Sequence, residues 1–265
     1  MNQTVLFAFA ATLLTWGLTA LGAAIVVFFS SPARKIMNLA LGFAAGVMIA
    51  ASFWSLLQPA IERAEAAQGI PAYVVATLGF LLGAIFMWGS DKIVTRAQKK
   101  AASETVGGSS MSRIIMLILS ITLHNIPEGL AVGVAFGILG SSPSPESIMG
   151  AVTIAIGIGL QNFPEGAAVS LPLRREGYSR KKSFFLGQAS GMVEPIAGVL
   201  GAMLVVYVEA ILPLALSFAA GAMILVAVHE LIPECRQNME DQPYFATMGI
   251  VAGFATMMLL DVMLG

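Results

Sequence analysis

The sequence predicts an all-α membrane protein that crosses the bilayer with eight transmembrane helices. Its 265 residues are 57% hydrophobic and only 11% charged, and the mean hydropathy is +0.85. Soluble domains carry about 25% charged residues. The apolar residues gather in long stretches, and the basic residues fall between these stretches with a strong bias to one side. These three observations indicate a multi-pass integral protein of a cell membrane, either a bacterial inner membrane or a plasma membrane.

Eight apolar stretches reach the roughly 20 residues that a helix needs to cross a hydrocarbon layer of about 30 Å. The first has no Lys or Arg before it and is longer than the apolar part of a signal peptide, so we expect it to be a membrane helix. The connections are short, except for a polar, small-residue-rich cytoplasmic loop at about 96–111, which we expect to be flexible. The expected helices form one transmembrane domain over 1–265 and span about 4–29, 36–58, 72–95, 112–139, 147–173, 182–208, 211–233 and 244–264.

The basic residues predict the orientation of these helices. With the N-terminus outside and the loops alternating, every Lys and Arg except Arg63 falls on the cytoplasmic side, as the positive-inside rule requires. A wrong number of helices would have spread these residues over both sides. Both termini are therefore expected outside, and the basic cytoplasmic residues are Arg34, Lys35, Lys92, Arg96, Lys99, Lys100, Arg113, Arg174, Arg175, Arg180, Lys181, Lys182 and Arg236.

Two pairs of segments repeat within the chain. Residues 39–50 and 214–225 are identical at all but three aligned positions, and they lie in helices that are expected to run in opposite directions. A second pair, residues 124–129 and 161–166, shares the pattern polar–Asn–apolar–Pro–Glu–Gly, again in oppositely directed helices. Repeats of inverted topology are typical of membrane transporters, which bind their substrate near the bilayer midplane.

The first proline motif places polar chemistry where hydrocarbon is expected. His124 and Glu128 are four residues apart and therefore share one face of a helix, with Asn125 about 100° round from His124. Pro127 removes the backbone hydrogen bond to the carbonyl of Leu123, which predicts a kink and a free carbonyl oxygen at membrane depth. Such groups are tolerated only inside protein or beside a wet cavity, and ionisable groups there are functional candidates.

The second motif repeats this chemistry with Gln161, Asn162 and Glu165, and the next helix adds Glu194. Packed together, the two motifs would bring an imidazole, carboxylates and carboxamides into one place. Carboxylates in a low-dielectric site repel one another, and a divalent cation removes that repulsion. Imidazole combined with carboxylates suits zinc, iron and manganese. Metal loading should depend on pH, because these ligands must be deprotonated to bind.

The chain lacks the ligands of a tight structural zinc site. Cys235 is the only cysteine, so the sequence excludes an intrachain disulfide and a cysteine-based zinc site. Carboxamides are weak ligands, and a mixed set of this kind suits a site that must release its ion.

The motifs resemble those of the ZIP family of divalent-metal transporters, most closely its GufA-like branch. The resemblance rests on the two proline motifs, on Gly191-x-x-Glu194-Pro195 and on His229-Glu230. It implies a homodimer that carries a divalent cation into the cytoplasm by alternating access, with the first, fourth, fifth and sixth helices moving as a unit. Zinc is the expected cargo, and Cd²⁺, Fe²⁺ and Mn²⁺ are further candidates; neither an organic cofactor nor a nucleic acid is expected.

The resemblance also implies the ligands of a two-metal site. One subsite would use His124, Glu128, Gln161, Glu165 and Met48. The other would use Asn125, Glu128, Asn162, Glu165 and Glu194, with the two shared glutamates bridging. Asp91, His229 and Glu230 would form a relay at the cytoplasmic exit.

Three departures from the family pattern concern the metal. Many members have a histidine where Gln161 stands, so this first subsite is expected to be less selective for zinc. Members with an acid where Asn162 stands have a more negative second subsite. The connection at about 96–111 lacks the histidine-rich segment that many members have there, so it gives no support to metal sensing or buffering.

Two alternatives stay open at this point. An intramembrane metal-dependent hydrolase would need a second histidine, as in H-E-x-x-H, but His229-Glu230 is followed by residues 231–233 with no histidine. A metal channel or a metal sensor would use the same ligands without a carrier cycle.

Overall fold

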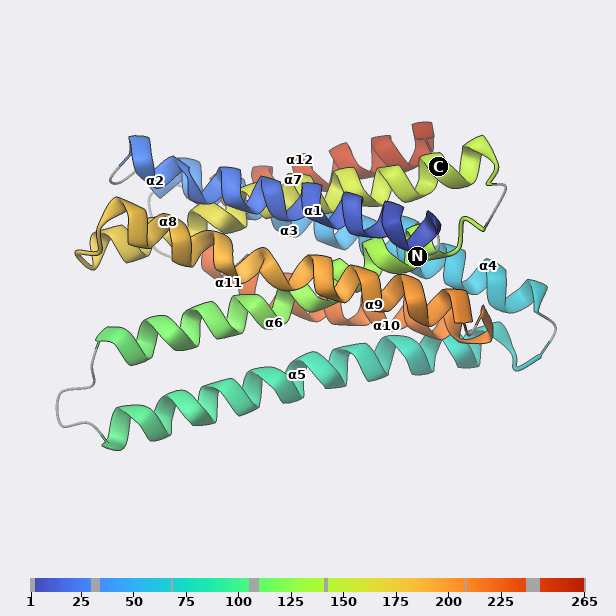
Figure 1. Cartoon of the computed structure of the whole chain (residues 1–265), viewed down its shortest axis with the longest axis horizontal. Helices are drawn as coiled ribbons and strands as arrows, with labels where there is room; N and C mark the ends of the chain where they lie inside the picture. Colours follow the sequence, from blue (N-terminus) through green and yellow to red (C-terminus); the bar gives the residue numbers. More distant parts are fainter. Residues whose placement is uncertain are drawn as a thin grey trace.

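The computed structural model describes residues 3–29, 34–67, 69–104, 110–140, 143–207, 209–236 and 244–264, and none of these residues lies in a strand. The helices run along the long axis of the molecule as a bundle, and both termini lie at one end of it (Figure 1). Seven helical segments are long and apolar enough to cross a membrane, and α6 (Ser110–Gly137) is a further helix of 28 residues. The prediction of an all-α membrane protein is confirmed.

Each predicted stretch coincides with a helix or with a run of consecutive helices. In chain order these are α1 (Gln3–Ala23) and α2 (Ile25–Phe28); α3 (Arg34–Ala51), the π-helix η1 (Ser52–Leu57) and α4 (Gln58–Ala66); α5 (Ala72–Glu104); α6; α7 (Pro145–Arg175); α8 (Arg180–Ala189), η2 (Ser190–Met192) and α9 (Val193–Tyr207); η3 (Glu209–Ile211), α10 (Leu212–Val226), the π-helix η4 (Ala227–Leu231) and α11 (Ile232–Cys235); and α12 (Tyr244–Leu264).

The expected flexible loop at about 96–111 is shorter than predicted. Helix α5 continues to Glu104 and α6 begins at Ser110, which leaves only 105–109 between them, outside the described residues. The reason is local, because residues 96–104 consist mostly of Ala, Lys, Arg, Gln and Glu, which favour helix. Likewise, the second pass extends to Ala66, beyond the predicted end near residue 58.

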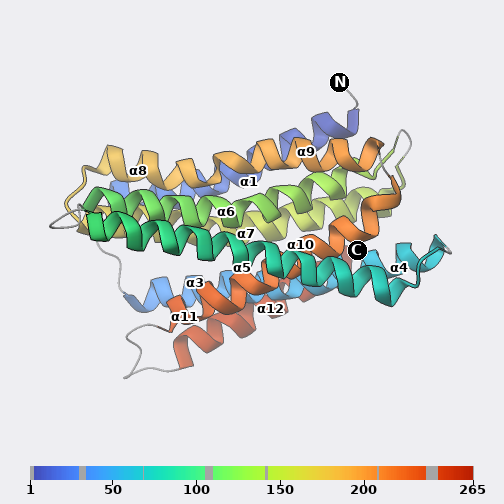
Figure 2. The same ribbon diagram turned by 90° about the horizontal axis from the view of Figure 1, so that it is seen from below.

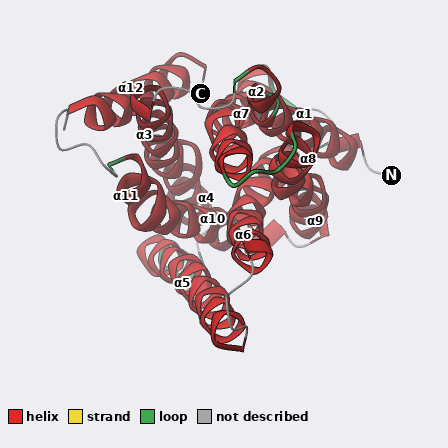
Figure 3. Cartoon of the chain, turned by 90° about the vertical axis from the view of Figure 1, so that its left-hand side faces the viewer, coloured by secondary structure: helices red, strands yellow, loops and turns green. Residues whose placement is uncertain are grey.

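The helices pack in two groups, which Figure 2 and Figure 3 separate most clearly. One group joins α1, α6, α7 and α8–α9, with α1 against α7 and α6 against α9. The other joins α3, α5, α10 and α12, with α3 against α12 and α5 against α10. Helices α3 and α7 make the most extensive contact between the groups. The first group contains the four passes that the family resemblance assigns to a moving unit.

The inverted repeat of 39–50 and 214–225 builds the same contact twice. A Cβ on Gly253 of α12 would lie 2.0 Å from the carbonyl oxygen of Phe43, and one on Gly83 of α5 would lie 1.9 Å from that of Phe218. Phe43 and Phe218 are equivalent positions of the repeat. Only glycine allows backbones to approach this closely. Each repeat is also followed by a π-helix, η1 in one case and η4 in the other.

Candidate metal site

The glycine of each proline motif brings a partner helix against the motif. Both α6 and α7 continue as helices through Pro127 and Pro164. A Cβ on Gly129 would lie 2.6 Å from the carbonyl oxygen of Glu194, and one on Gly166 would lie 2.0 Å from that of Thr19. These contacts bring α9 against α6 and α1 against α7, and so carry Glu194 and Thr19 to the two motifs.

Two carboxamides of α7 bind two carboxylates on neighbouring helices. Gln161 Nε2 donates a hydrogen bond of 2.6 Å to Glu128 Oε1 on α6, and Asn162 Nδ2 donates one of 2.8 Å to Glu194 Oε2 on α9. All four side chains are buried almost completely. The carboxylates of Glu128, Glu165 and Glu194 lie near enough for their charges to repel one another. The structure therefore brings Glu128 and Glu194 against Gln161 and Asn162 of the second motif.

Four buried oxygens of the two motifs have no hydrogen-bond partner. They are Asn125 Oδ1, Glu128 Oε2, Gln161 Oε1 and Asn162 Oδ1. Leaving such a group unsatisfied costs about 1–3 kcal/mol, and more for a charged group. All four are acceptors and no protein donor faces them, so a cation or a water molecule would satisfy them. Both amide nitrogens of α7 are already bound to carboxylates, which leaves the amide oxygens free.

Carboxamide oxygens are needed to complete any metal site here. Among the described residues, no three His, Cys, Asp or Glu side chains are grouped closely enough to hold a metal ion by themselves. Each of the two predicted subsites contains three such residues, so the structure does not bring either predicted ligand set together in full. A ligand set that includes carboxamides binds more weakly than one of histidine and cysteine alone.

His124 contacts a residue that the sequence placed in the exit relay. His124 Nε2 lies 2.6 Å from Glu230 Oε1, so η4 reaches the first proline motif directly. The other two relay residues are close to each other, with His229 Nε2 3.8 Å from Asp91 Oδ2. The side chain of His229 is 63% exposed and that of Glu230 is 27% exposed, whereas that of His124 is 8% exposed. Exposure thus rises from the buried motif towards the end of the bundle opposite the termini.

Comparison with known proteins agrees with this geometry. Residues 95–261 match the model of the family described as ZIP zinc transporter. The chain is 43% identical to the zinc transporter ZIP11 of Xenopus tropicalis, with 96% of each chain covered. It is 36% identical to the zinc transporter GufA of Myxococcus xanthus, with coverage of 96% of this chain and 98% of that one.

The chain belongs to the ZIP family. The resemblance read from its motifs is thereby confirmed, and because ZIP proteins are transporters rather than enzymes, the hydrolase alternative is set aside. The human zinc transporter ZIP11 is 41% identical over the whole of this chain and 99% of its own length.

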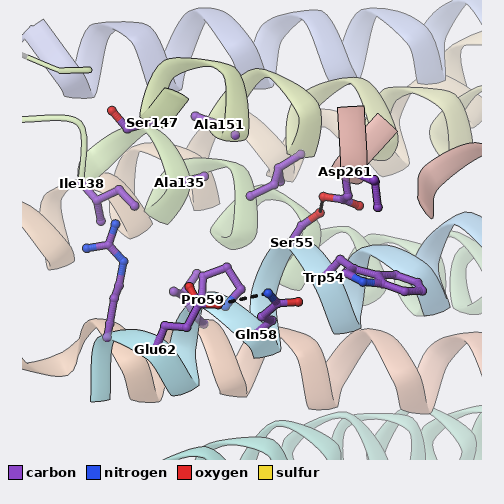
Figure 4. A pocket seen from close by; sticks show the side chains of 15 residues that line it. Trp54, Ser55, Gln58, Pro59, Glu62, Ala135, Ile138, Ser147, Ala151 and Asp261 are labelled. Carbon is purple, nitrogen blue, oxygen red and sulfur yellow. Dashed lines mark hydrogen bonds between the residues drawn. The ribbon is translucent and has the colours of Figure 1, made fainter. Parts of the chain in front are cut away.

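In this ZIP protein, a pocket of about 460 Å³ opens at the end of the bundle that holds the termini (Figure 4). Ser55 Oγ donates a hydrogen bond of 2.6 Å to Asp261 Oδ1 across it, and Gln58 Nε2 donates one of 3.0 Å to Glu62 Oε1. The second oxygen of Asp261 is buried without a partner. The pocket thus combines a mixed polar and apolar lining with one unsatisfied carboxylate oxygen.

Apolar side chains separate this pocket from the motifs. Its lining residues Ala135 and Ile154 each lie seven positions along the helix from Glu128 and Gln161, or about 10 Å. Ile158, which lies between Ile154 and Gln161 on α7, is fully buried within the core cluster. The role of Met48 as a ligand stays a prediction.

The sequence analysis missed three polar residues near these sites. Thr15 and Thr19 of α1 both donate to Glu194, at 2.6 Å and 3.4 Å. Asp261 lies eight positions after Gly253, as Asp91 lies eight after Gly83, and these two glycines contact equivalent positions of the repeat. Applying the repeat to Asp91 would have pointed to Asp261. The threonines share one face of α1, which is a weaker signal.

Proposed function

We propose that this protein carries divalent metal ions, zinc foremost, across the membrane into the cytoplasm through the paired proline motifs of α6 and α7. The observation that carries the proposal is the group of four buried, unpartnered acceptor oxygens beside mutually repelling carboxylates. A divalent cation satisfies the oxygens and removes the repulsion at once. The names of the relatives support zinc as the cargo.

The proposed ligands form two subsites. His124, Glu128, Gln161 and Glu165 hold the first ion, with Met48 as a fifth ligand. Asn125, Asn162 and Glu194 hold the second ion, together with the bridging Glu128 and Glu165. We propose that the transported ions include Cd²⁺, Fe²⁺ and Mn²⁺ and that the protein works as a homodimer in the lipid bilayer.

The two packing groups suggest how the metal site opens first to one side of the membrane and then to the other. In this structure, buried apolar side chains separate the motifs from the pocket at the termini, while Glu230 links His124 to the partly exposed opposite end. We propose that this arrangement is a state in which the site communicates with the cytoplasmic side. Sliding the group of α1, α6, α7 and α8–α9 against α3 and α10 would open the pocket side and close the other.

The test is zinc uptake by proteoliposomes that contain the purified protein. Glu128→Ala and His124→Ala should each abolish most uptake, because each removes a ligand of the first subsite. Glu146→Ala is the matched control, since Glu146 is an exposed carboxylate at the start of α7. Unchanged uptake in both site variants would contradict the proposed site. Open-pore currents in the same vesicles would contradict a carrier.

A further inference from the structure

The carboxylate of Glu194 is held asymmetrically. Its Oε2 accepts two short hydrogen bonds, from Thr15 Oγ1 at 2.6 Å and from Asn162 Nδ2 at 2.8 Å. Its Oε1 accepts one long bond, from Thr19 Oγ1 at 3.4 Å. A carboxylate oxygen has two lone pairs, so Oε2 is saturated and Oε1 keeps one lone pair free.

The hydroxyl of Thr15 donates its proton to Glu194 rather than to its own helix. It also lies 3.1 Å from the carbonyl oxygen of Thr12, but a hydroxyl has one proton to donate. The bond to the carboxylate is shorter and charge-assisted, and bonds of this kind are about twice as strong as neutral ones. Thr19 differs, because its hydroxyl lies 3.4 Å both from Glu194 Oε1 and from the carbonyl oxygen of Thr15. The hydrogen bond from Thr19 to Glu194 is therefore weak and easily replaced, whereas the bond from Thr15 is strong.

Thr15 also orients the second polar side chain. Its carbonyl oxygen accepts a hydrogen bond of 3.2 Å from Asn162 Nδ2, which already donates to Glu194. Both protons of that amide are thus used, and Asn162 Oδ1 stays buried without a partner. One residue of α1 therefore determines which oxygen of Glu194 and which atom of Asn162 remain available.

We infer that Thr15 is a positioning residue of the second metal subsite, which makes Glu194 a one-oxygen ligand through Oε1. The inference rests on the proposed function, because it takes Asn162 and Glu194 as ligands. The incoming cation replaces the long bond from Thr19 and leaves the bonds from Thr15 and Asn162 in place. Removing a group that hydrogen-bonds a metal ligand in this way typically lowers metal affinity by about 10–100-fold.

Substitutions of the two threonines that bond Glu194 should affect binding of the second metal ion differently. Thr15→Val keeps the shape of the side chain but removes the donor to Oε2, so the second metal ion should bind about 10–100-fold more weakly, with the first unchanged. Thr15→Ser keeps the hydroxyl and should restore wild-type affinity. Thr19→Val removes only the long bond that the cation displaces, so it should bind both ions at least as well as wild type. Thr12→Val is the control, because Thr12 is equally buried but bonds within its own helix.

The experiment is a calorimetric titration of the purified, detergent-solubilised protein with Cd²⁺ and with Zn²⁺, with melting temperatures measured to check folding. Loss of the second equivalent in Thr15→Val, its return in Thr15→Ser and its retention in Thr19→Val and Thr12→Val are expected. Equal second-ion affinity in wild type and Thr15→Val would overturn the positioning role, as would a wild-type protein that binds a single equivalent. A wild-type protein that binds no metal would contradict the proposed function itself.

Discussion

The substitution Gln161→His tests where metal preference is determined. Gln161 is fully buried, its Nε2 donates to Glu128 Oε1 at 2.6 Å, and its Oε1 has no partner. A neutral imidazole has one donor and one acceptor nitrogen. Histidine can therefore keep the hydrogen bond to Glu128 and replace a weak amide ligand with a strong one.

The size of the expected change in metal preference depends on whether the hydrogen bond to Glu128 or only the metal ligand changes. If the bond to Glu128 were lost, a hydrogen bond to a charged group would be removed, at a cost of about 1.5–3 kcal/mol. If it is kept, the main change is from an oxygen to an imidazole nitrogen, which favours zinc over manganese. We expect the ratio of kcat/KM for zinc over manganese to rise about tenfold, equivalent to about 1.4 kcal/mol.

The assay is competitive uptake of zinc, cadmium, iron and manganese into proteoliposomes, with and without a pH gradient. Gln188→His is the matched control, because Gln188 of α8 bonds only the backbone of its own helix through its side chain. Robust uptake by Gln161→His with an unchanged zinc-to-manganese ratio would refute the reasoning. A similar shift in Gln188→His would point to a general effect of added histidine.

Three further predictions concern other parts of the molecule. Asp261→Asn should raise KM for zinc with little change in maximal rate, because the pocket carboxylate attracts cations. The difference in KM from wild type should shrink at high salt, and zinc uptake at two ionic strengths measures this. Glu230→Gln should lower the maximal rate more than KM, because its contact with His124 links the site to the more exposed His229 and Asp91. The same uptake kinetics measures this. Gly133→Ala should lower the melting temperature strongly, because the new Cβ would lie 2.1 Å from a carbonyl oxygen of α9, whereas Gly17→Ala, with open space around it, should not. Equal melting temperatures for these two variants would contradict the packing described.

The passes and most of the candidate site are predictable because both depend on local patterns. Hydropathy alone locates the helices. The doubled motif identifies Glu128 and Gln161 as polar residues within apolar stretches and therefore as functional candidates. The extension of α5 to Glu104 was missed because its end is polar, although it is rich in helix-forming residues.

The contacts that were missed join residues far apart in the chain. Thr15 and Glu194 are separated by 179 positions. A threonine in a membrane helix can always bond the carbonyl one turn before it, so nothing in the sequence distinguishes Thr15 from Thr12. The contact between His124 and Glu230 was missed for a different reason. It depends on the path of the π-helix η4, which hydropathy does not reveal.

The central claim is that the two proline motifs together bind the transported ion. Its most direct test is anomalous diffraction at the zinc edge from crystals of the protein grown with zinc. The account predicts a peak between α6 and α7, within about 2.0–2.2 Å of carboxylate oxygens of Glu128 and Glu165, that disappears in Glu128→Ala. A zinc peak found only elsewhere, or one that persists unchanged in that variant, would contradict it.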